Sequence, residues 1–195
     1  KKVGNLYWSG DARMRYTASS NDKKADVYDG RIRLNVKGQV NEATYVQGQF
    51  VNNMDFKDGA SSNTTMAQIY VNHNFGKNVA VRLGRQPIAF GNQGGWLYNA
   101  LEGYDGAQVS YNNAKLSLTT GFGQMNGGDT TVAEDNLKNK DFYFAKGAYD
   151  FDFAKLNADY IVKKDGATAD EKDFEVYGVG LNVPVQKFNV FGEYW

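Results

Sequence analysis

Short stretches in which polar and apolar residues alternate run from one end of this 195-residue chain to the other. We count about eleven of them, and no span of comparable length repeats at the helical period. Alternation of this kind is typical of β-strands that present one polar and one apolar face. The segments are 5–17, 27–38, 43–54, 66–75, 79–86, 104–112, 115–123, 142–150, 155–163, 174–183 and 188–195. The sequence therefore predicts an all-β fold.

The connections between these segments alternate strictly between short and long. The short ones contain the Gly, Asn and Pro residues of tight turns, and they are 39–42, 76–78, 112–114, 151–154 and 184–187. The long ones are 18–26, 55–65, 87–103, 124–141 and 164–173. In an up-and-down antiparallel sheet, this order places every tight turn at one rim and every long loop at the other. That layout is typical of a transmembrane β-barrel of the outer membrane.

The charged residues of a segment share one face. Asp11, Arg13 and Arg15 lie on one face of the first segment, and Arg31 and Arg33 lie on one face of the second. Two folds fit this pattern. A soluble sandwich buries its apolar face in a core, whereas a membrane barrel turns that face to lipid and lines a water-filled lumen with the charged one. The order of the loops and the aromatic content of 14% favour the barrel.

Composition excludes several classes of function. The 22 basic and 22 acidic residues cancel, so no net charge points to nucleic acid. Cysteine is absent and His73 is the single histidine, which removes thiol catalysis, disulfides and the common zinc sites. A hydrolase triad would have to use His73, and "IYVNHNFG" around it carries no catalytic signature. We therefore expect no catalytic residue, no metal site and no cofactor.

The third long connection differs from the other four, which are polar. The stretch "RQPIAFGNQGGWLYNALEGYDG" is rich in glycine and aromatic residues and carries two carboxylates. Such a loop is poorly suited to bulk water, whereas inside a barrel its rings can pack on the wall. We predict that it folds inward and constricts the lumen. The candidate constriction residues are Phe90, Trp96, Tyr98, Glu102 and Asp105.

The stretch "VRLGRQPIAFGNQGGWLYNALEGYDGAQVSY" resembles the outer-membrane porins, in which a long third loop follows a strand and returns into the next. The start, "VGNLYWSGDARMRY", resembles the barrels of porins that follow an S-layer-homology domain in diderm Firmicutes. The resemblance implies a homotrimer of barrels, usually of sixteen strands each, surrounded by outer-membrane lipid. It also implies passive diffusion of small hydrophilic solutes and ions, and a tether to peptidoglycan or cell wall through an N-terminal region that this sequence lacks.

An odd number of segments conflicts with the even strand numbers of single-chain bacterial barrels. We therefore expect 1–195 to be a single, incomplete barrel domain that lacks about five C-terminal strands. The alternative is that "FNVFGEYW" is a genuine barrel terminus. In that case one segment is misassigned, and the closed barrel has ten or twelve strands.

The leading functional hypothesis is a passive diffusion channel with a basic wall and no nucleic-acid partner. The candidate wall residues are Arg13, Arg15, Arg31, Arg33 and Arg82. Two alternatives stay open. One is a soluble or surface-attached β-domain, such as an adhesin or binding module, on which these arginines form a solvated strand face. The other is a carbohydrate-specific channel, in which Trp96, Tyr98 and Tyr104 supply an aromatic slide.

Overall fold

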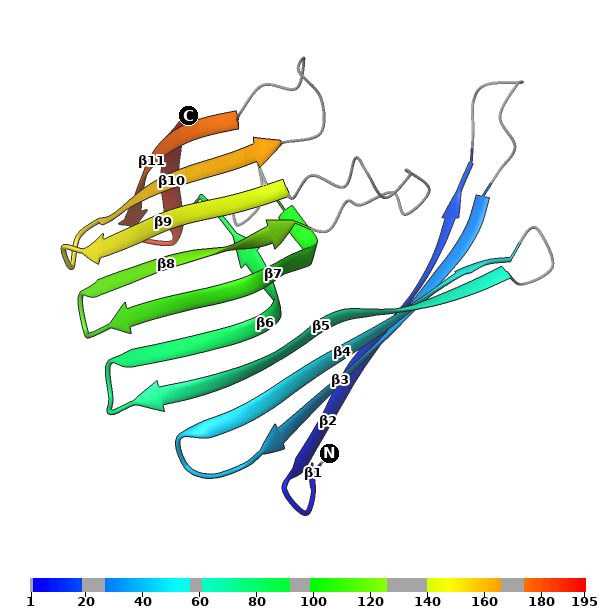
Figure 1. Ribbon diagram of the computed structural model, residues 1–195. Coiled ribbons are helices and arrows are strands. Elements are labelled where there is room, and N and C mark those ends of the chain that lie inside the picture. The colour runs from blue at the N-terminus through cyan, green and yellow to red at the C-terminus, as the bar shows by residue number, and fades with distance from the viewer. Residues whose placement is uncertain (1, 19–26, 57–60, 92–98, 126–139, 166–173) are drawn as a thin grey trace. The chain divides into compact units, whose positions relative to one another are not determined.

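The computed structural model describes residues 2–18, 27–56, 61–91, 99–125, 140–165 and 174–195. Within these residues the chain forms twelve strands, and hydrogen-bonded neighbours follow one another in chain order from β1 to β12 (Figure 1). The strands are β1 (Lys2–Val3), β2 (Leu6–Thr17), β3 (Val27–Gln39), β4 (Thr44–Asp55), β5 (Ser61–Phe75), β6 (Val79–Ala89), β7 (Asn99–Asn112), β8 (Leu116–Met125), β9 (Lys140–Asp150), β10 (Lys155–Asp165), β11 (Phe174–Val185) and β12 (Phe188–Tyr194). No helix in the described residues is long and apolar enough to cross a membrane.

The strands belong to two compact units, Lys1–Val71 and Asn72–Trp195, and β5 contributes to both. The eleven alternating segments of the sequence correspond to β2–β12, so the all-β up-and-down fold is confirmed. The two-residue strand β1 is an addition that the alternation did not reveal.

Local hydrogen bonds close the short connections. In the turn between β3 and β4, Asn41 Oδ1 accepts hydrogen bonds from the backbone N–H groups of Ala43 and Thr44. Asn113 Oδ1 accepts in the same way from Lys115 and Leu116 between β7 and β8. These Asn side chains replace backbone partners that a tight turn cannot supply. The short connections lie where the sequence predicts them, but the predicted second long connection is wrong: β4 ends at Asp55 and β5 begins at Ser61, so this connection spans 56–60 instead of 55–65.

The register confirms the faces expected in the first unit. Asp11 lies opposite Arg33, Arg13 opposite Arg31 and Arg15 opposite Asp29, so the charged residues of β2 and β3 share one side. The other side carries apolar pairs such as Ala12 with Ile32.

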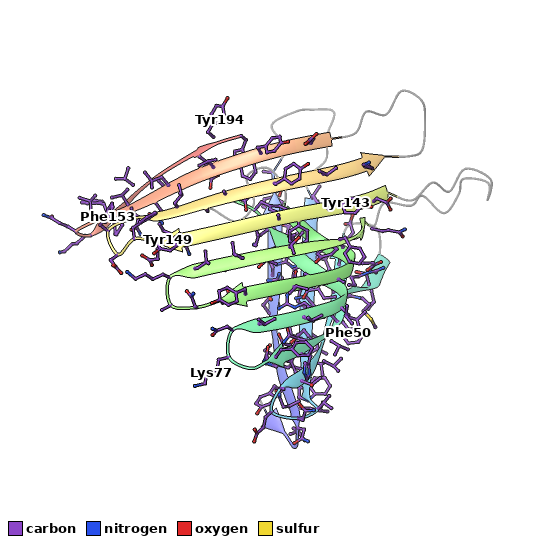
Figure 2. The ribbon with its side chains drawn as sticks, turned by 60° about the vertical axis from the view of Figure 1, so that its left-hand side comes forward. Phe50, Lys77, Tyr143, Tyr149, Phe153 and Tyr194 are labelled. Carbon is purple, nitrogen blue, oxygen red and sulfur yellow. The ribbon has the colours of Figure 1, made fainter. Side chains whose placement is uncertain are left out.

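The second unit repeats this division across β7–β11. Ser110, Thr119, Lys146 and Asp159 form one polar row of register partners. Side chains stand off both faces of the strands (Figure 2). On the apolar face, Tyr149 contacts Phe151 at the short-turn end with ring centroids 4.7 Å apart. In the first unit, Tyr16 meets Tyr28 at the long-loop end with centroids 4.6 Å apart. Aromatic rings at the strand ends are typical of the interfacial girdles of membrane barrels.

The predicted bounds of the third long connection were wrong. Pro87 does not end β6, which continues to Ala89, and β7 begins at Asn99 rather than near residue 104. The register shifts between Gln86 and Ile88, so Pro87 lies at an irregularity of the ladder. A proline is tolerated there because a bulged residue need not donate a ladder hydrogen bond. The connection therefore spans 90–98 instead of 87–103.

Candidate functional site

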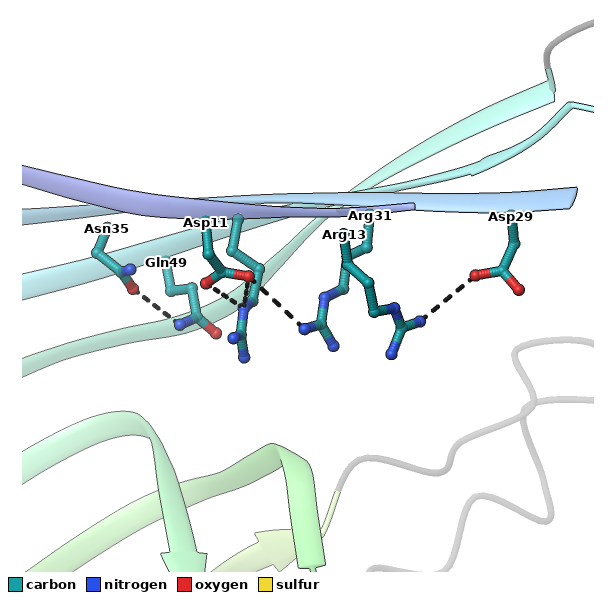
Figure 3. A network of polar contacts seen from close by, with 7 residues as sticks. Asp11, Arg13, Asp29, Arg31, Asn35 and Gln49 are labelled. Atoms are coloured by element: carbon teal, nitrogen blue, oxygen red, sulfur yellow. Dashed lines mark hydrogen bonds and ion pairs between the residues drawn. The ribbon is translucent and has the colours of Figure 1, made fainter. Parts of the chain in front are cut away.

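Four arginines of β2 and β3 share two aspartates on the polar face of the first unit. Figure 3 shows Arg13 and Arg31 with both aspartates. Arg33 donates from Nε to Asp11 Oδ2 at 2.8 Å, and Arg31 Nη2 lies 3.6 Å from Oδ1 of the same carboxylate. Arg15 donates from Nε to Asp29 Oδ2 at 2.8 Å, and Arg13 Nη2 lies 3.5 Å from Asp29 Oδ1. Four guanidinium groups against two carboxylates leave a surplus of two positive charges. We call these six residues the cationic wall.

Arg13 and Arg31, which lie directly opposite each other in the ladder, make the longer contacts in the cationic wall. Like charges in opposite positions repel each other unless counter-charges lie nearby. Nε of Arg31 is buried and has no hydrogen-bond partner among the described residues. The positive charges of Arg13 and Arg31 are thus the less closely paired ones in the wall, and positive charge attracts an anion.

Polar side chains extend the cationic wall towards the short-turn end. Gln49 donates to Asn35 Oδ1 at 2.8 Å (Figure 3). Gln68 Nε2 in turn donates to Gln49 Oε1 at 3.4 Å. Lys37 Nζ lies 3.9 Å from the centre of the Tyr45 ring. The polar face of β2–β5 thus carries amide side chains that hydrogen-bond to one another, in addition to the charged residues of the cationic wall.

In the second unit, the segment that leaves β6 is fixed to the polar face of β9 and β10. Lys146 Nζ donates to the backbone carbonyl of Ala89 at 2.9 Å, and Asp159 Oδ2 accepts from the backbone N–H of Gly91 at 2.9 Å. Between these two bonds, the Phe90 side chain is buried. We call Ala89, Phe90 and Gly91 the loop root.

An apolar cluster holds the loop root in place. Phe90, Ile88, Tyr104, Phe144 and Ile161 are buried together, and Trp195 packs against them. Phe144 meets Phe90 and Tyr104 edge to face, with ring centroids 5.7 and 5.6 Å apart. A Cβ atom at Gly121 would lie 2.5 Å from the Phe144 ring, so the close approach of this ring requires glycine. The cluster covers part of a face that is otherwise polar, because the chain folds back onto it there.

A polar hollow of about 270 Å³ adjoins the loop root. Its lining includes Lys146 and Asp159, which hold the root, and Ser117, Lys155 and Asn182. The hollow is therefore lined by charged, hydroxyl and amide side chains that can donate and accept hydrogen bonds.

The predicted site residues fall in different places. Arg13, Arg15, Arg31 and Arg33 come together in the cationic wall, while Arg82 lies on the polar face of the second unit opposite Gln108. Phe90 lies in the loop root. Trp96 and Tyr98 lie outside the described residues, as does the side chain of Glu102.

Asp105 does not lie on the polar face, contrary to its predicted place in the constriction. It lies in β7 opposite Arg85 and forms a two-pronged ion pair with it, with N–O distances of 2.8 and 2.9 Å. Because β7 is already regular at this point, Asp105 alternates with Tyr104 and shares the apolar face with Ala107 and Val109. There it belongs to a polar row at the long-loop end, which consists of Arg85, Asp105, Gln124, Asp141 and Lys164.

Tyr104 was a candidate for an aromatic slide along the lumen. Its side chain has no exposed surface and its hydroxyl donates to Gln108 Oε1 at 3.1 Å. A solute cannot stack on a ring that is fully covered, so Tyr104 stabilises the loop root instead.

Sequence reasoning missed Lys146 and did not single out Asp159. Asp159 lies in the alternating stretch "KLNADYIVK", but its hydrogen-bond partner is a backbone N–H 68 residues away in the chain. Lys146 lies in a segment whose alternation is broken by Phe144 on the polar face. His73, the one candidate for acid–base catalysis, packs edge-on against Phe75 with ring centroids 4.5 Å apart. In the described part of the chain, no group of three or more His, Asp or Glu side chains is placed to hold a metal ion.

Comparison with known proteins agrees with this geometry. Residues 2–94, just under half of the chain, match the family model of phosphate-selective porin O and P. Solved structures of variants of the porin from Rhodobacter blastica superpose with TM-scores of 0.59 and 0.57. They are 15% and 16% identical to this chain, and each alignment covers 96% of this chain and 73% of the porin. No curated protein sequence matches. The likeness to these structures shows the fold, that of a transmembrane β-barrel.

Proposed function

We propose that this chain, an outer-membrane porin, conducts small hydrophilic solutes and ions and favours anions among them. The observation that carries the proposal is the cationic wall, with its surplus of two positive charges on the polar face of β2 and β3. In a porin barrel the polar face lines the water-filled lumen and the apolar face meets lipid. The wall therefore acts on whatever passes through the lumen.

The arrangement of donors supports a preference for oxyanions. Guanidinium groups bind carboxylate and phosphate in two-pronged geometry, and Arg13 and Arg31 are the members of the wall with the weaker aspartate contacts. The matching family model, which covers the strands that bear the wall, is that of phosphate-selective porins. Phosphate is accordingly the first solute to test.

We further propose that the connection 90–98 narrows the lumen and that the protein is a homotrimer, the usual assembly of porins. The loop root supports the first point, because Lys146 and Asp159 fix it to the polar face rather than at the rim. Charges at a narrow site of low dielectric act on ions more strongly than charges at an open mouth.

The test is the reversal potential of the purified full-length protein in a planar bilayer under a salt gradient. Replacing Arg13, Arg15, Arg31 and Arg33 together by Gln turns the wall from a surplus of two positive charges into two negative ones. The permeability ratio should then shift towards cations. The shift should be larger in dilute salt, because the screening length is about 10 Å at 0.1 M and shortens as salt is added.

Two control variants sharpen this test. The double variant Asp11→Asn and Asp29→Asn raises the positive surplus and should shift selectivity the other way. Lys115→Gln removes a lysine whose partner is Asp152, at 2.7 Å in the short turns, and should leave selectivity unchanged. If all three proteins keep the wild-type permeability ratio, the wall does not face the ion path.

A further inference from the structure

We propose that the apolar face of β7–β11 binds one phosphatidylethanolamine molecule, with an acyl chain in a groove and the headgroup at Glu175 and Lys164. The groove has a volume of about 670 Å³. Its floor consists of small residues, Ala145, Gly147 and Ala158, and its walls include Leu118, Tyr160 and Tyr177. Larger side chains surround this row of small ones. The small residues therefore leave a hollow in the apolar face, whereas the larger side chains around them project from it.

The groove continues towards the long-loop end. A second hollow of about 450 Å³ shares Val109, Thr120, Ala145 and Tyr160 with the first and extends past Phe122 and Tyr143. The combined groove thus leads from the middle of the apolar face towards the polar row that contains Asp141 and Lys164. An acyl chain has this course in a bilayer, with its headgroup at the level where charged side chains begin.

The occupant is a lipid because of where this face lies. In a membrane barrel the apolar face contacts hydrocarbon, and here Tyr177 and Val179 are 63% and 51% exposed. A hollow in this face is out of reach of bulk water, and its lining loses dispersion contacts unless an apolar chain fills it.

A carboxylate, that of Glu175, adjoins the groove because two of the tyrosines that line the groove hold it. The Tyr160 and Tyr177 rings stack with centroids 4.8 Å apart, and both hydroxyls donate to Glu175 Oε1, at 2.8 and 2.6 Å. Both donors use the same oxygen, so Oε2 keeps its capacity to accept. A negative charge at the border of the hydrocarbon region is costly without a cationic partner. The primary ammonium of an ethanolamine headgroup supplies both the charge and the N–H donors.

Lys164, which lies opposite Asp141 in the ladder, provides the complementary charge for the phosphate. Glu175 is the register partner of Val162, so Lys164 lies two residues nearer the long loops on the same side of β10. Lysine binds phosphate as a point charge. A cation one step beyond an anion matches a headgroup that carries both a phosphate and an ammonium, and it does not match a purely anionic headgroup.

The experiment measures lipids retained by the purified full-length protein. The protein in detergent is mixed with equal amounts of phosphatidylethanolamine, phosphatidylglycerol and phosphatidylcholine with identical acyl chains, and native mass spectrometry identifies what stays bound. We expect one phosphatidylethanolamine per chain, preferred at least about fivefold over phosphatidylglycerol, because only its ammonium matches Glu175.

Variants separate the headgroup contact from the groove. Glu175→Gln should abolish the preference for phosphatidylethanolamine while lipid is still retained. Ala145→Phe and Ala158→Phe should fill the groove and lower the retention of all three lipids. Ala12→Phe, on the apolar face of the first unit, should behave as wild type. Equal retention of the three lipids by the wild type would overturn the headgroup assignment.

Three further results would overturn the proposal as a whole. Undiminished retention in Ala145→Phe would show that the lipid binds elsewhere. A change of oligomeric state in this variant, with lipid retention unaltered, would show that the groove receives a second copy of the chain. When lipopolysaccharide is added to the mixture in equal amount, its preferential retention would refute the choice of a phospholipid.

Discussion

Gly91 combines a left-handed backbone conformation with a crowded environment. Its φ is +78°, and a Cβ atom at this position would lie 2.9 Å from Glu193 Oε1. Its N–H group is also the donor to Asp159. One residue without a side chain thus lets the chain turn onto the polar face and form a hydrogen bond to it.

Gly91→Ala should destabilise the folded barrel by about 1–2 kcal/mol, because L-residues are strained at this φ. It should also raise current noise, because the added Cβ crowds Glu193 and displaces the hydrogen bond to Asp159. Gly76→Ala is the matched control, since Gly76 has a φ of +68° but no atom within 4 Å of the added Cβ. Thermal unfolding on gels should show a larger loss for Gly91→Ala, because only this variant also disturbs the hydrogen bond to Asp159. Altered conductance in the control alone would contradict this view of the loop root.

Lys146 tests the other hydrogen bond of the loop root. Lys146→Met keeps most of the apolar stem but removes the donor to the Ala89 carbonyl and leaves Asp159 without its neighbouring positive charge. We expect larger single-channel conductance with more frequent transitions, because the root is then held by fewer bonds. Lys155→Met, which alters the same hollow without touching Ala89, should change conductance less. Equal effects of the two variants would mean that lysine charge in the hollow, not the anchor, sets the conductance.

At the scale of a strand, the apolar face requires uncharged side chains, whereas the polar face accepts charged ones. Leu34 is 40% exposed on the apolar face of β3, and its neighbour Asn35 bonds to Gln49 on the polar face. In a bilayer the first side chain meets hydrocarbon and the second meets water. Successive residues of one strand should therefore tolerate charge very differently.

Leu34→Arg should obstruct insertion into vesicles, at a cost of roughly 2–4 kcal/mol near the bilayer midplane. Asn35→Arg, one residue along the same strand, should insert almost as well as wild type because its charge reaches water. The folded fraction on unheated gels measures both. Greater sensitivity at Asn35 would invert the faces and indicate a soluble core.

At the scale of the whole molecule, the sequence predicted the strands and faces well and the loop root poorly. Each strand alternates with period two in its own sequence, so β2–β12 could be predicted without any tertiary information. The end of β6 was predicted too early at Pro87, because a proline usually ends a regular strand but is tolerated at a bulge. Lys146 could not be recognised, because its partner is the carbonyl of Ala89, a backbone group that carries no signature in the sequence. Asp105 was assigned to the constriction, but it lies inside β7, where it alternates with Tyr104 and so points to the other face.

The central claim is that the polar face lines a water-filled pore, and cysteine scanning along β3 tests it most directly. The chain contains no cysteine, so each substitution introduces a single thiol. The positions are Arg33, Asn35 and Lys37 on the polar face, and Ile32, Leu34 and Val36 on the apolar face. Single-channel current is recorded before and after addition of a bulky, charged, membrane-impermeant thiol reagent.

We predict that the reagent lowers the current through the three polar-face variants and leaves the three apolar-face variants unchanged. This period of two follows because only alternate side chains reach the lumen. A current that falls at the apolar-face positions, or at none of the six, would contradict the assignment of the polar face to the pore.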